Sequence, residues 1–285
     1  MPKAYVLYNP LAGFGAHKEE LIALNAVISD VIVFCDLTKE NVYKERLTSL
    51  EEDDYIIVCG GDGTLNRFVN DIADIELKNR VLYYPIGSGN DFAKDLGKKS
   101  AEPPFEITCL IKKLPIAEID GKKWRVINGV GFGIDGYCCE KGDEIKAKGK
   151  KVDYTAIAIT GLLFKYKPTD ATVTVDGKSY SYKKVWIAPT MHGRYYGGGM
   201  IPTPNQNRRA EDGKLSLMVF HGSGKLKTLS IFPSIFKGEH LSHTDCVSVH
   251  EGYNITVEFN RPSPLQVDGE TVRNVTKYTI YSTRR

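Results

Sequence analysis

Apolar residues in the first third of the chain form short continuous runs, and segments with helical spacing separate these runs. The runs that predict strands are residues 4–8, 31–34, 56–59 and 81–84. The segments that predict helices are residues 18–29, 39–50, 65–72 and one that begins near residue 91. Continuous apolar strands separated by helices are typical of a parallel sheet covered on both faces. We therefore predict an α/β domain with a doubly wound parallel sheet over residues 1–123.

From about Trp124 onward the pattern changes to an alternation of apolar and polar residues. Residues 171–189 alternate with period two around Asp176-Gly177, which is a strong signal for a β-hairpin. Further predicted strands are residues 215–220, 247–250, 255–259, 265–267 and 278–281, and predicted helices are residues 152–164 and 225–236. Residues 124–285 are therefore predicted to form an antiparallel β-sandwich, with an open barrel as the alternative.

Composition adds little to this picture. The hydrophobic share of 42% and the charged share of 26% are ordinary for a globular protein. The net charge of +3 gives no indication of a nucleic-acid partner.

The cysteines show no CxxC spacing, so we expect free thiols in a reducing, cytoplasmic compartment. The first residues already have the pattern of a strand, so we expect no signal peptide. The longest uncharged apolar run, residues 155–164, is shorter than the about 20 residues of a membrane-spanning helix.

Glycine-rich segments follow three of the predicted parallel strands. Gly60-Gly61-Asp62-Gly63-Thr64 connects a strand to a helix, where glycine backbone amides and a helix N-terminus favour an anion. The segment lacks the lysine of a P-loop, and its spacing alone leaves phosphate binding and a tight structural turn open. "NPLAGFG" (residues 9–15) and "PIGSGNDFA" (residues 85–93) have similar positions. The carboxyl ends of parallel strands meet at one sheet edge, so the three loops predict one composite site.

Together, "NPLAG", "GGDGTLN" and "PIGSGNDFA" resemble the catalytic domain of the diacylglycerol kinase family, which includes sphingosine, ceramide and bacterial lipid kinases. Segments of the second half resemble the family in the same order: "INGVGFGIDG" (127–136), "YYGGGMIPTPN" (195–205), "AEDGKLSL" (210–217) and "LQVDGE" (265–270). The resemblance implies a kinase that uses ATP and Mg²⁺ to phosphorylate a lipid hydroxyl. Diacylglycerol is the first choice of acceptor, and its product is phosphatidic acid.

The resemblance also implies roles for individual residues. The implied ATP contacts are Asn9, Pro10, Leu11, Ala12, Gly13, Thr38, Gly60, Gly61, Asp62, Gly63, Thr64, Leu65, Asn66 and Ser88. Ala12 stands where many members have serine, and Ser88 replaces the commoner threonine. Glu270 matches the family's general base, and Asp62 could take this role or orient Mg²⁺ through water. A structural Mg²⁺ loop is implied by the Asp212 side chain with the carbonyl oxygens of Arg209 and Lys214.

Each of these assignments has a structural alternative. Thr38 could be a helix N-cap, and Asp268-Gly269-Glu270 could be one more hairpin turn. Asp135 could shape a turn, and His192 is expected to be a structural hydrogen-bonding residue. The lysine-rich stretch of residues 141–151 is expected to be a solvated loop, or in a lipid kinase a contact for anionic headgroups.

Two other functions share some of these features. An NAD kinase also contains GGDGT, although "GSGNDFA" and "VDGE" fit lipid kinases better. A nucleotide- or lipid-binding regulator without turnover is the alternative outside the enzymes. For the lipid kinase we expect peripheral association with a membrane surface and no nucleic acid, and the sequence leaves a monomer and a homodimer open. The lining for a lipid chain is expected from residues 156–164 and 229–236.

Overall fold

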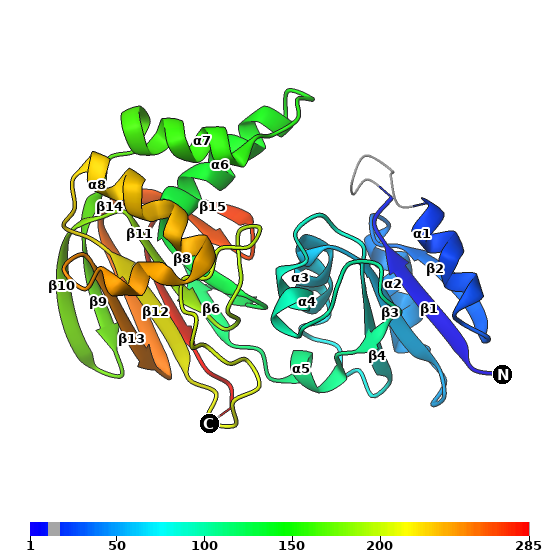
Figure 1. Cartoon of the computed structure of the whole chain (residues 1–285). Helices are drawn as coiled ribbons and strands as arrows, with labels where there is room; N and C mark the ends of the chain where they lie inside the picture. Colours follow the sequence, from blue (N-terminus) through cyan, green and yellow to red (C-terminus); the bar gives the residue numbers. More distant parts are fainter. Residues whose placement is uncertain (11–17, 285) are drawn as a thin grey trace. The chain divides into compact units, whose positions relative to one another are not determined.

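The computed structural model describes residues 1–10 and 18–284 and divides the chain into two units, Met1–Lys113 and Leu114–Arg285 (Figure 1). The predicted boundary, after residue 123, lies inside strand β7 (Lys122–Arg125). β7 pairs with β6 (Ile116–Ile119), which in turn pairs with the last strand of the second unit. This hairpin therefore belongs to the second sheet. No helix in the described part of the chain is long and apolar enough to cross a membrane.

The first unit is built on a mostly parallel five-stranded sheet with the order β2-β1-β3-β4-β5. Its strands are β1 (Lys3–Tyr8), β2 (Val31–Asp36), β3 (Tyr55–Gly60), β4 (Arg80–Pro85) and β5 (Phe105–Glu106). The first four are parallel, which confirms the predicted parallel sheet. The short edge strand β5 runs antiparallel to β4 and was not predicted. Because β1, β3 and β4 are neighbours, their carboxyl ends lie side by side.

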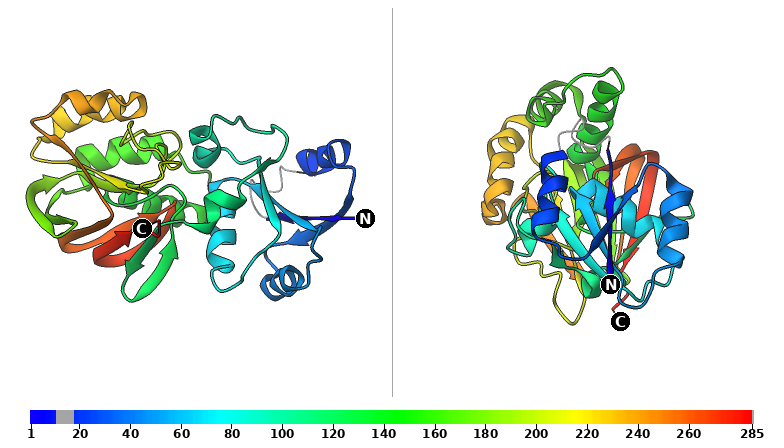
Figure 2. Two further views of the ribbon diagram at one scale, coloured as in Figure 1. Left: turned by 90° about the horizontal axis from the view of Figure 1, so that it is seen from below. Right: turned by 90° about the vertical axis from the view of Figure 1, so that its right-hand side faces the viewer.

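Helices cover both faces of this sheet, and α1 and α2 lie on opposite faces (Figure 2). The helices are α1 (Lys18–Ala23) with the 3₁₀ turn η2 (Leu24–Ala26), α2 (Glu40–Thr48), α3 (Asp62–Asp71), α4 (Asp91–Asp95) and α5 (Thr108–Lys112). Helix α3 begins three residues earlier than predicted, because Gly61 is its N-cap and Asp62, Gly63 and Thr64 form its first turn. Thr38 is not a helix cap, since α2 has Lys39 at that position and no side-chain cap.

The second unit contains a ten-stranded antiparallel sheet with the path β13-β12-β11-β8-β14-β15-β6-β7. The strands not yet given are β8 (Gly129–Gly133), β9 (Thr169–Val175), β10 (Lys178–Val185), β11 (Ile187–Met191), β12 (Leu215–Phe220), β13 (Val247–Gly252), β14 (Asn254–Val267) and β15 (Glu270–Tyr281). The two predicted strands at 255–259 and 265–267 are parts of β14. Pro262 and Pro264 lie between them, and the strand accommodates these prolines where its register with β15 shifts.

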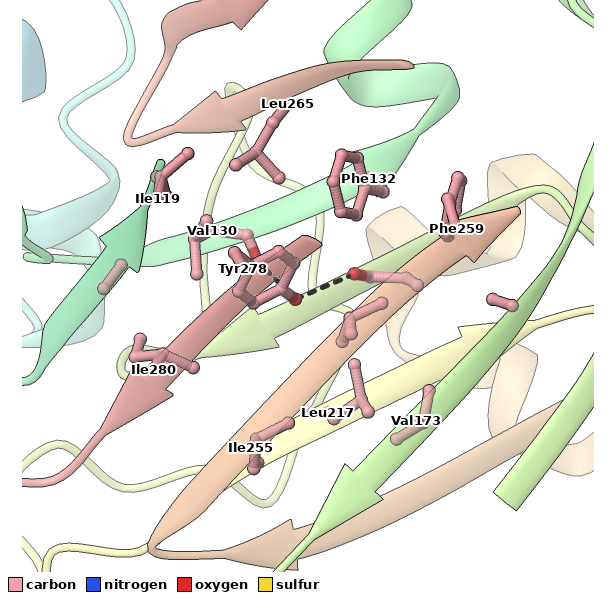
Figure 3. Close-up of a cluster of buried hydrophobic side chains, with 14 of the residues drawn as sticks. Ile119, Val130, Phe132, Val173, Leu217, Ile255, Phe259, Leu265, Tyr278 and Ile280 are labelled. Atoms are coloured by element: carbon pink, nitrogen blue, oxygen red, sulfur yellow. Dashed lines mark hydrogen bonds between the residues drawn. The ribbon is translucent and has the colours of Figure 1, made fainter. Parts of the chain in front are cut away.

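Strand β14 is the branch point of this sheet. Its first half pairs with β9, and its second half pairs with β8, while β15 runs along its other side. The inward-facing side chains of these strands share one apolar core, in which Tyr278 lies beside Val130 and Phe132 (Figure 3). The hydroxyl group of Tyr278 is 2.9 Å from that of Thr190 and 3.3 Å from the Val130 carbonyl oxygen. The buried Tyr278 hydroxyl thereby has hydrogen-bond partners.

Helices lie outside the larger sheet. They are α6 (Ile134–Lys146), α7 (Tyr154–Thr160) with the π-helical turn η3 (Gly161–Lys165), and α8 (Lys225–Ile231) with the 3₁₀ turns η4 (Phe232–Lys237) and η5 (Glu239–Ser242). The prediction of a solvated loop over residues 141–151 is wrong for its first half, which is helical. Gly136 and Gly142 obscured this helix in the sequence. A Cβ at Gly136 would stand 2.1 Å from the Pro264 carbonyl oxygen, so this glycine allows α6 to contact β14.

Two histidines and two tyrosines join the β9–β10 hairpin to strands β12 and β13. The Tyr182 hydroxyl lies 2.5 Å from His250 Nε2, and the ring of Tyr180 packs against that of His250 in a tilted arrangement at 4.2 Å. The ring of His221 packs against Tyr182 at 4.5 Å. Burial lowers the pKa of both His221 and His250, and nearby Lys178 adds to the effect on His250. The folded unit therefore favours neutral imidazoles at this junction.

We expect the protein to lose stability as the pH falls below about 6.5, the ordinary pKa of histidine. In that range the unfolded chain takes up protons that the folded chain resists, which favours unfolding. Burial raises the pKa of the Asp135 carboxyl, so the folded chain takes up this proton more readily than the unfolded chain. Asp135 therefore contributes a pH dependence of stability with the opposite sign. Thermal melting across this range should show a shallower pH dependence for His250→Gln than for wild type, with His243→Gln as the control. An unchanged slope in His250→Gln would contradict the role of this junction.

Candidate active site

The loops that follow β3 and β4 contact each other through glycines. Gly60 pairs with Pro85, and the Ile86 amide donates to the Gly60 carbonyl oxygen at 3.2 Å. A Cβ at Gly87 would stand 2.3 Å from the Cα of Gly61, so no side chain fits there. Gly63 has nothing within 4 Å of its Cβ position, so this residue of the first turn of α3 faces open space. Two of the three predicted loops are thus in contact.

Asp62 connects the two loops. Its Oδ2 accepts a hydrogen bond from the Asp91 amide at 2.8 Å, and its Oδ1 accepts one from the Phe92 amide at 2.8 Å. These amides form the first turn of α4, so the Asp62 carboxylate satisfies two N–H groups that have no partner within that helix. Asp62, for which the sequence predicted a role as general base or in orienting Mg²⁺, therefore also has a structural role.

Three further residues support the loops, and sequence reasoning did not single them out. Asn90 adopts a left-handed conformation with φ of 53°, and its side chain accepts from the Gly87 amide and donates to the Gly87 carbonyl oxygen. Buried Tyr83 donates to the Gly60 carbonyl oxygen at 3.1 Å. Burial and the Asp62 carboxylate raise the pKa of Tyr83 well above its ordinary value, so its hydroxyl stays protonated. The Asp91 carboxylate is buried, 3.7 Å from Lys94 Nζ.

The predicted ATP contacts in this part of the unit differ in exposure. Ser88 and Gly63 are exposed and Gly61 and Asp62 are half-buried, whereas Gly60, Thr64, Leu65 and Asn66 are buried. Leu65 is fully buried in the core, and its amide donates to the Gly61 carbonyl oxygen at 3.1 Å. Neither the side chain nor the amide of Leu65 is presented to a ligand. Asn66 accepts a hydrogen bond from Asn70 at 2.9 Å.

The remaining predicted contacts follow β1 and β2. Asn9 is half-buried and Pro10 is exposed at the end of β1, whereas Leu11, Ala12 and Gly13 lie outside the described residues. Thr38 is exposed just after β2, and its hydroxyl donates to Asp36 at 2.7 Å. Because β2 is parallel to β1, this threonine lies at the same sheet edge as the glycine loops.

In the second unit, Asp268 organises the turn between β14 and β15. Asp268 and Gly269 have φ values of 48° and 91° and form a two-residue hairpin turn, so the turn interpretation is confirmed. The buried Asp268 carboxylate also accepts hydrogen bonds from the amides of Ile127, Asn128 and Gly129 at 2.7, 2.8 and 2.9 Å. These three bonds fix the hairpin end to the segment that leads into β8.

A buried arginine, Arg208, acts on the same segment. Its guanidinium donates to the Ile127 carbonyl oxygen at 3.0 Å and to Asn128 Oδ1 at 2.8 Å. Neither Asp268 nor Arg208 was predicted as a site residue, because their partners lie far away in the sequence. Glu270, the predicted base, is the first residue of β15 and is exposed. Asp268 is therefore a positioning residue for the strand end that carries Glu270.

The predicted Mg²⁺ loop contains basic side chains close to its oxygens. Asp212 Oδ1 accepts from the Lys214 amide at 3.2 Å, and Oδ2 lies 3.8 Å from Lys214 Nζ. The Lys214 carbonyl oxygen accepts from Gln206 at 3.0 Å. The Arg209 amide donates to Asn207 Oδ1. The Arg284 guanidinium donates to the carbonyl oxygens of Arg208 and Ala210. The loop presents oxygen ligands, but a cation at Asp212 would have to displace the Lys214 ammonium group.

Asp135 lies in the first turn of α6, and its carboxylate is buried rather than at a surface turn. The Tyr196 hydroxyl donates to its Oδ2 at 3.2 Å. Burial raises the pKa of the Asp135 carboxyl to about 6. His192 is buried as well, and burial, with the charges of Arg208 and Arg284, lowers its pKa well below the ordinary value. A neutral, buried His192 agrees with the structural role predicted for it.

No group of three or more histidine, cysteine, aspartate and glutamate side chains suitable for a metal occurs in the described ranges 1–10 and 18–284. The cysteines among these residues are free thiols, as predicted. A metal ion would therefore need ligands from backbone carbonyl groups or from a bound substrate, in addition to single carboxylates such as Asp62 and Asp212.

Comparison with known proteins agrees with this architecture. Residues 3–120 match the family described as the diacylglycerol kinase catalytic domain. Residues 128–279 match the family described as the YegS C-terminal NAD kinase beta sandwich-like domain. The second match covers more than half of the chain and confirms the predicted β-sandwich class.

Individual relatives are similar over much of the chain. A protein named diacylglycerol kinase from Bacillus subtilis (strain 168) is 24% identical over 286 residues, covering 95% of this chain and 90% of the relative. A diacylglycerol kinase from Mycobacterium tuberculosis (strain ATCC 25618 / H37Rv) is 24% identical over 232 residues, covering 75% and 73%. The crystal structure of a diacylglycerol kinase from Bacillus anthracis str. Sterne superposes with a TM-score of 0.63 at 21% identity, covering 99% of this chain and 94% of that one. At this identity the superposition shows the fold.

The glycine loops at the carboxyl edge of the parallel sheet, the antiparallel second domain and the two family matches agree with one another. The chain belongs to the diacylglycerol kinase catalytic-domain family, with a YegS-type C-terminal domain, and is a lipid kinase.

Proposed function

We propose that this lipid kinase transfers the γ-phosphoryl group of ATP to the hydroxyl of diacylglycerol and forms phosphatidic acid. The observation that carries the proposal is the junction of the two glycine loops, where Asp62 holds the first turn of α4 beside the first turn of α3. Helix N-termini and glycine backbones favour phosphate groups. The names of the relatives from Bacillus and Mycobacterium support diacylglycerol as the acceptor.

Two carboxylates are candidates for the general base, and their surroundings favour Glu270. Both oxygens of Asp62 already accept backbone hydrogen bonds, so a proton on either oxygen would disrupt the start of α4. Glu270 is exposed and can take up a proton without such a loss. We therefore assign proton removal from the lipid hydroxyl to Glu270. Asp62 keeps the phosphate loops in place, and we assign to its carboxylate the orientation of Mg²⁺ through water.

Mg²⁺ is proposed as the cofactor, because in phosphoryl transfer it offsets the negative charge on the phosphate oxygens. At the second proposed position, Asp212 and the carbonyl oxygens of Arg209 and Lys214 suit a hard cation that prefers oxygen ligands. For a cation to bind there, the Lys214 ammonium group has to move away from the Asp212 carboxylate.

Added Mg²⁺ is expected to raise the melting temperature of wild type more than that of Asp212→Ala. A cation that binds only the folded state stabilises it by mass action, and the variant lacks the Asp212 carboxylate. The measurement is thermal melting of both proteins, without nucleotide, over a range of Mg²⁺ concentrations. Asp120→Ala, an exposed aspartate in the turn between β6 and β7, is the control. Identical responses of wild type and Asp212→Ala would leave Asp212 as an ordinary turn residue.

The function is tested by incubating the purified protein with labelled ATP and a mixed-lipid extract in micelles. The product is then identified by its mass. Phosphatidic acid is the expected product, and a phosphorylated sphingoid, prenol or phosphatidylglycerol would replace diacylglycerol as the acceptor. Transfer to NAD⁺ instead of lipid would favour the NAD kinase alternative. Tight nucleotide binding without any transfer would favour a regulator.

Peripheral membrane association and a homodimer are further predictions. The first is tested by vesicle binding, and the second by the mass of the protein in solution.

A further inference from the structure

Helix α6 contacts strand β15 immediately after Glu270. The Thr271 hydroxyl donates to Asp143 Oδ2 at 2.7 Å. Two residues further along the strand, Arg273 Nε lies 3.3 Å from Glu140 Oε1. The two residues on α6 are three positions apart and those on β15 are two positions apart, so each pair shares one face of its element. One face of the helix therefore lies along one face of the strand (Figure 1).

The start of α6 is close to the other strand of the same hairpin. A Cβ at Gly136 would stand 2.1 Å from the Pro264 carbonyl oxygen of β14. Gln266, two residues further along β14, accepts from the Gly269 amide through its Oε1 at 3.0 Å. Gln266 is also the cross-strand partner of Thr271, so the two side chains lie on the same face of the sheet. The helix thus contacts both strands that flank the turn.

Glu270 takes no part in the contacts between α6 and β15. Side chains alternate along a strand, so Thr271 and Arg273 face α6 while Glu270 lies on the opposite face. The cross-strand partner of Glu270 is Val267, which belongs to the apolar core on that side. Glu270 is nevertheless exposed, because it stands at the end of the strand. The helix therefore holds the strand from behind and leaves the Glu270 carboxylate free.

The bond between Thr271 and Asp143 is the stronger of the two contacts. Both residues are half-buried, and a hydroxyl that donates to a carboxylate makes a charge-assisted hydrogen bond. The Arg273 side chain is 56% exposed, so water and salt screen its ion pair. Lys146 Nζ lies 3.9 Å from Asp143 Oδ1, which leaves Oδ2 to Thr271. The position of β15 relative to α6 therefore depends mainly on this one hydrogen bond.

We propose that Asp143 and Thr271 are positioning residues for proton removal from the acceptor hydroxyl. The inference rests on the proposed function, in which Glu270 takes up this proton. The hydrogen bond fixes the backbone of β15 one residue after Glu270, so α6 sets the direction from which the carboxylate approaches the hydroxyl. Neither positioning residue touches the acceptor. A displacement of about 1 Å at a reacting group can lower a rate by about 10²-fold.

Steady-state kinetics with lipid in micelles, beside thermal melting, tests this role. Thr271→Val keeps the branched shape and removes the hydroxyl, and it should lower kcat by about 10–10²-fold without changing KM for ATP. Thr271→Ser keeps a hydroxyl and should retain most of the wild-type rate. Asp143→Ala should match Thr271→Val, and alanine suits the helix, so folding is expected to be retained. The combination of both substitutions should be no slower than either alone, because they remove the same bond.

Two control variants remove similar groups elsewhere. Lys146→Gln removes the neighbour of the other Asp143 oxygen and leaves the bond to Thr271 intact. Thr174→Val removes a threonine hydroxyl that lies 2.9 Å from the Ser179 hydroxyl in the β9–β10 hairpin. Both variants are expected to keep the wild-type kcat. An equal loss of kcat in Thr174→Val would overturn the positioning role, because the effect would then be a general one.

Combination with Glu270→Gln separates positioning from a purely structural role. In the Glu270→Gln background, Thr271→Val should cause no further loss of kcat, because Thr271 acts through the carboxylate that is already absent. The same loss in both backgrounds would overturn the proposal, and so would a wild-type kcat in both Thr271→Val and Asp143→Ala.

The outcomes also distinguish this proposal from the proposed function. If another lipid is phosphorylated in place of diacylglycerol, the acceptor in the proposed function is wrong, whereas the same variants measured with that lipid still support the positioning role. A wild-type rate in Glu270→Gln would reject both the base and its positioning residues. A slow Glu270→Gln beside a Thr271→Val with the wild-type rate would retain the base and reject the positioning role alone.

Discussion

Glu270→Gln is expected to lower kcat by about 10²–10⁴ while leaving the melting temperature unchanged, because the variant keeps the shape of the side chain and loses the proton acceptor. Glu270 is exposed at the start of β15, so the fold does not depend on its charge. The measurement is the steady-state rate with lipid in micelles, beside thermal melting. The rate of the variant should also lose the dependence on pH that the base imposes on wild type.

The matched control for this variant is Glu251→Gln, another exposed carboxylate of the second unit, which should retain the wild-type rate. If Glu270→Gln turned over at the wild-type rate, proton removal would have to be assigned elsewhere. Asp62 would then be the next candidate, and the junction of the two loops would have to tolerate its protonation.

Asp62→Asn is expected to lose both activity and stability, which distinguishes it from Glu270→Gln. The sequence alone suggests a nearly isosteric change that spares the fold. In the structure both carboxylate oxygens accept backbone N–H groups, and an asparagine offers one oxygen and one NH₂ group. One amide of α4 would then face a donor, which costs about 1–3 kcal/mol when the group is buried. The loss of charge beside the phosphates adds a decrease in kcat.

Thermal melting and the affinity for ATP are the measurements for Asp62→Asn. Both should decrease, and Asp74→Asn, an exposed aspartate of the same unit, should change neither. A variant with normal melting and normal ATP affinity but a low kcat would contradict the structural part of this role. Asp62 would then act on the chemistry alone.

Patterns within single segments predicted much of the fold. Strands such as β3 and β12 were predicted because a continuous apolar run leaves few alternatives to a buried strand. The hairpin at Asp176-Gly177 was predicted because the turn depends only on these two adjacent residues. Helix α6 was missed because Gly136 and Gly142 reduce its helical signal. Those glycines are there to allow close contact with the Pro264 carbonyl group and the Tyr154 ring. Propensity cannot reveal a contact that is formed only in the tertiary fold.

The site was predicted less completely than the fold. The loops were found because glycines cluster at strand ends, but the partners of Asp62 lie 29 and 30 residues further along the chain. Asp268 binds amides 139 to 141 residues away, and no short-range pattern reports such a pair. The resemblance indicated Glu270 and the loops, whereas the residues that hold them in place became visible only in the structure.

The contact between Gly61 and Gly87 has a consequence for how this edge of the sheet opens. The backbones touch, and the amides of Asp91 and Phe92 are covered by the carboxylate of the other loop. Exchange of these two amide hydrogens with solvent therefore requires both loops to separate at the same time. Their exchange rates should follow those of the Gly61 loop rather than those of the rest of α4. Bound nucleotide, by holding either loop, should slow exchange in both.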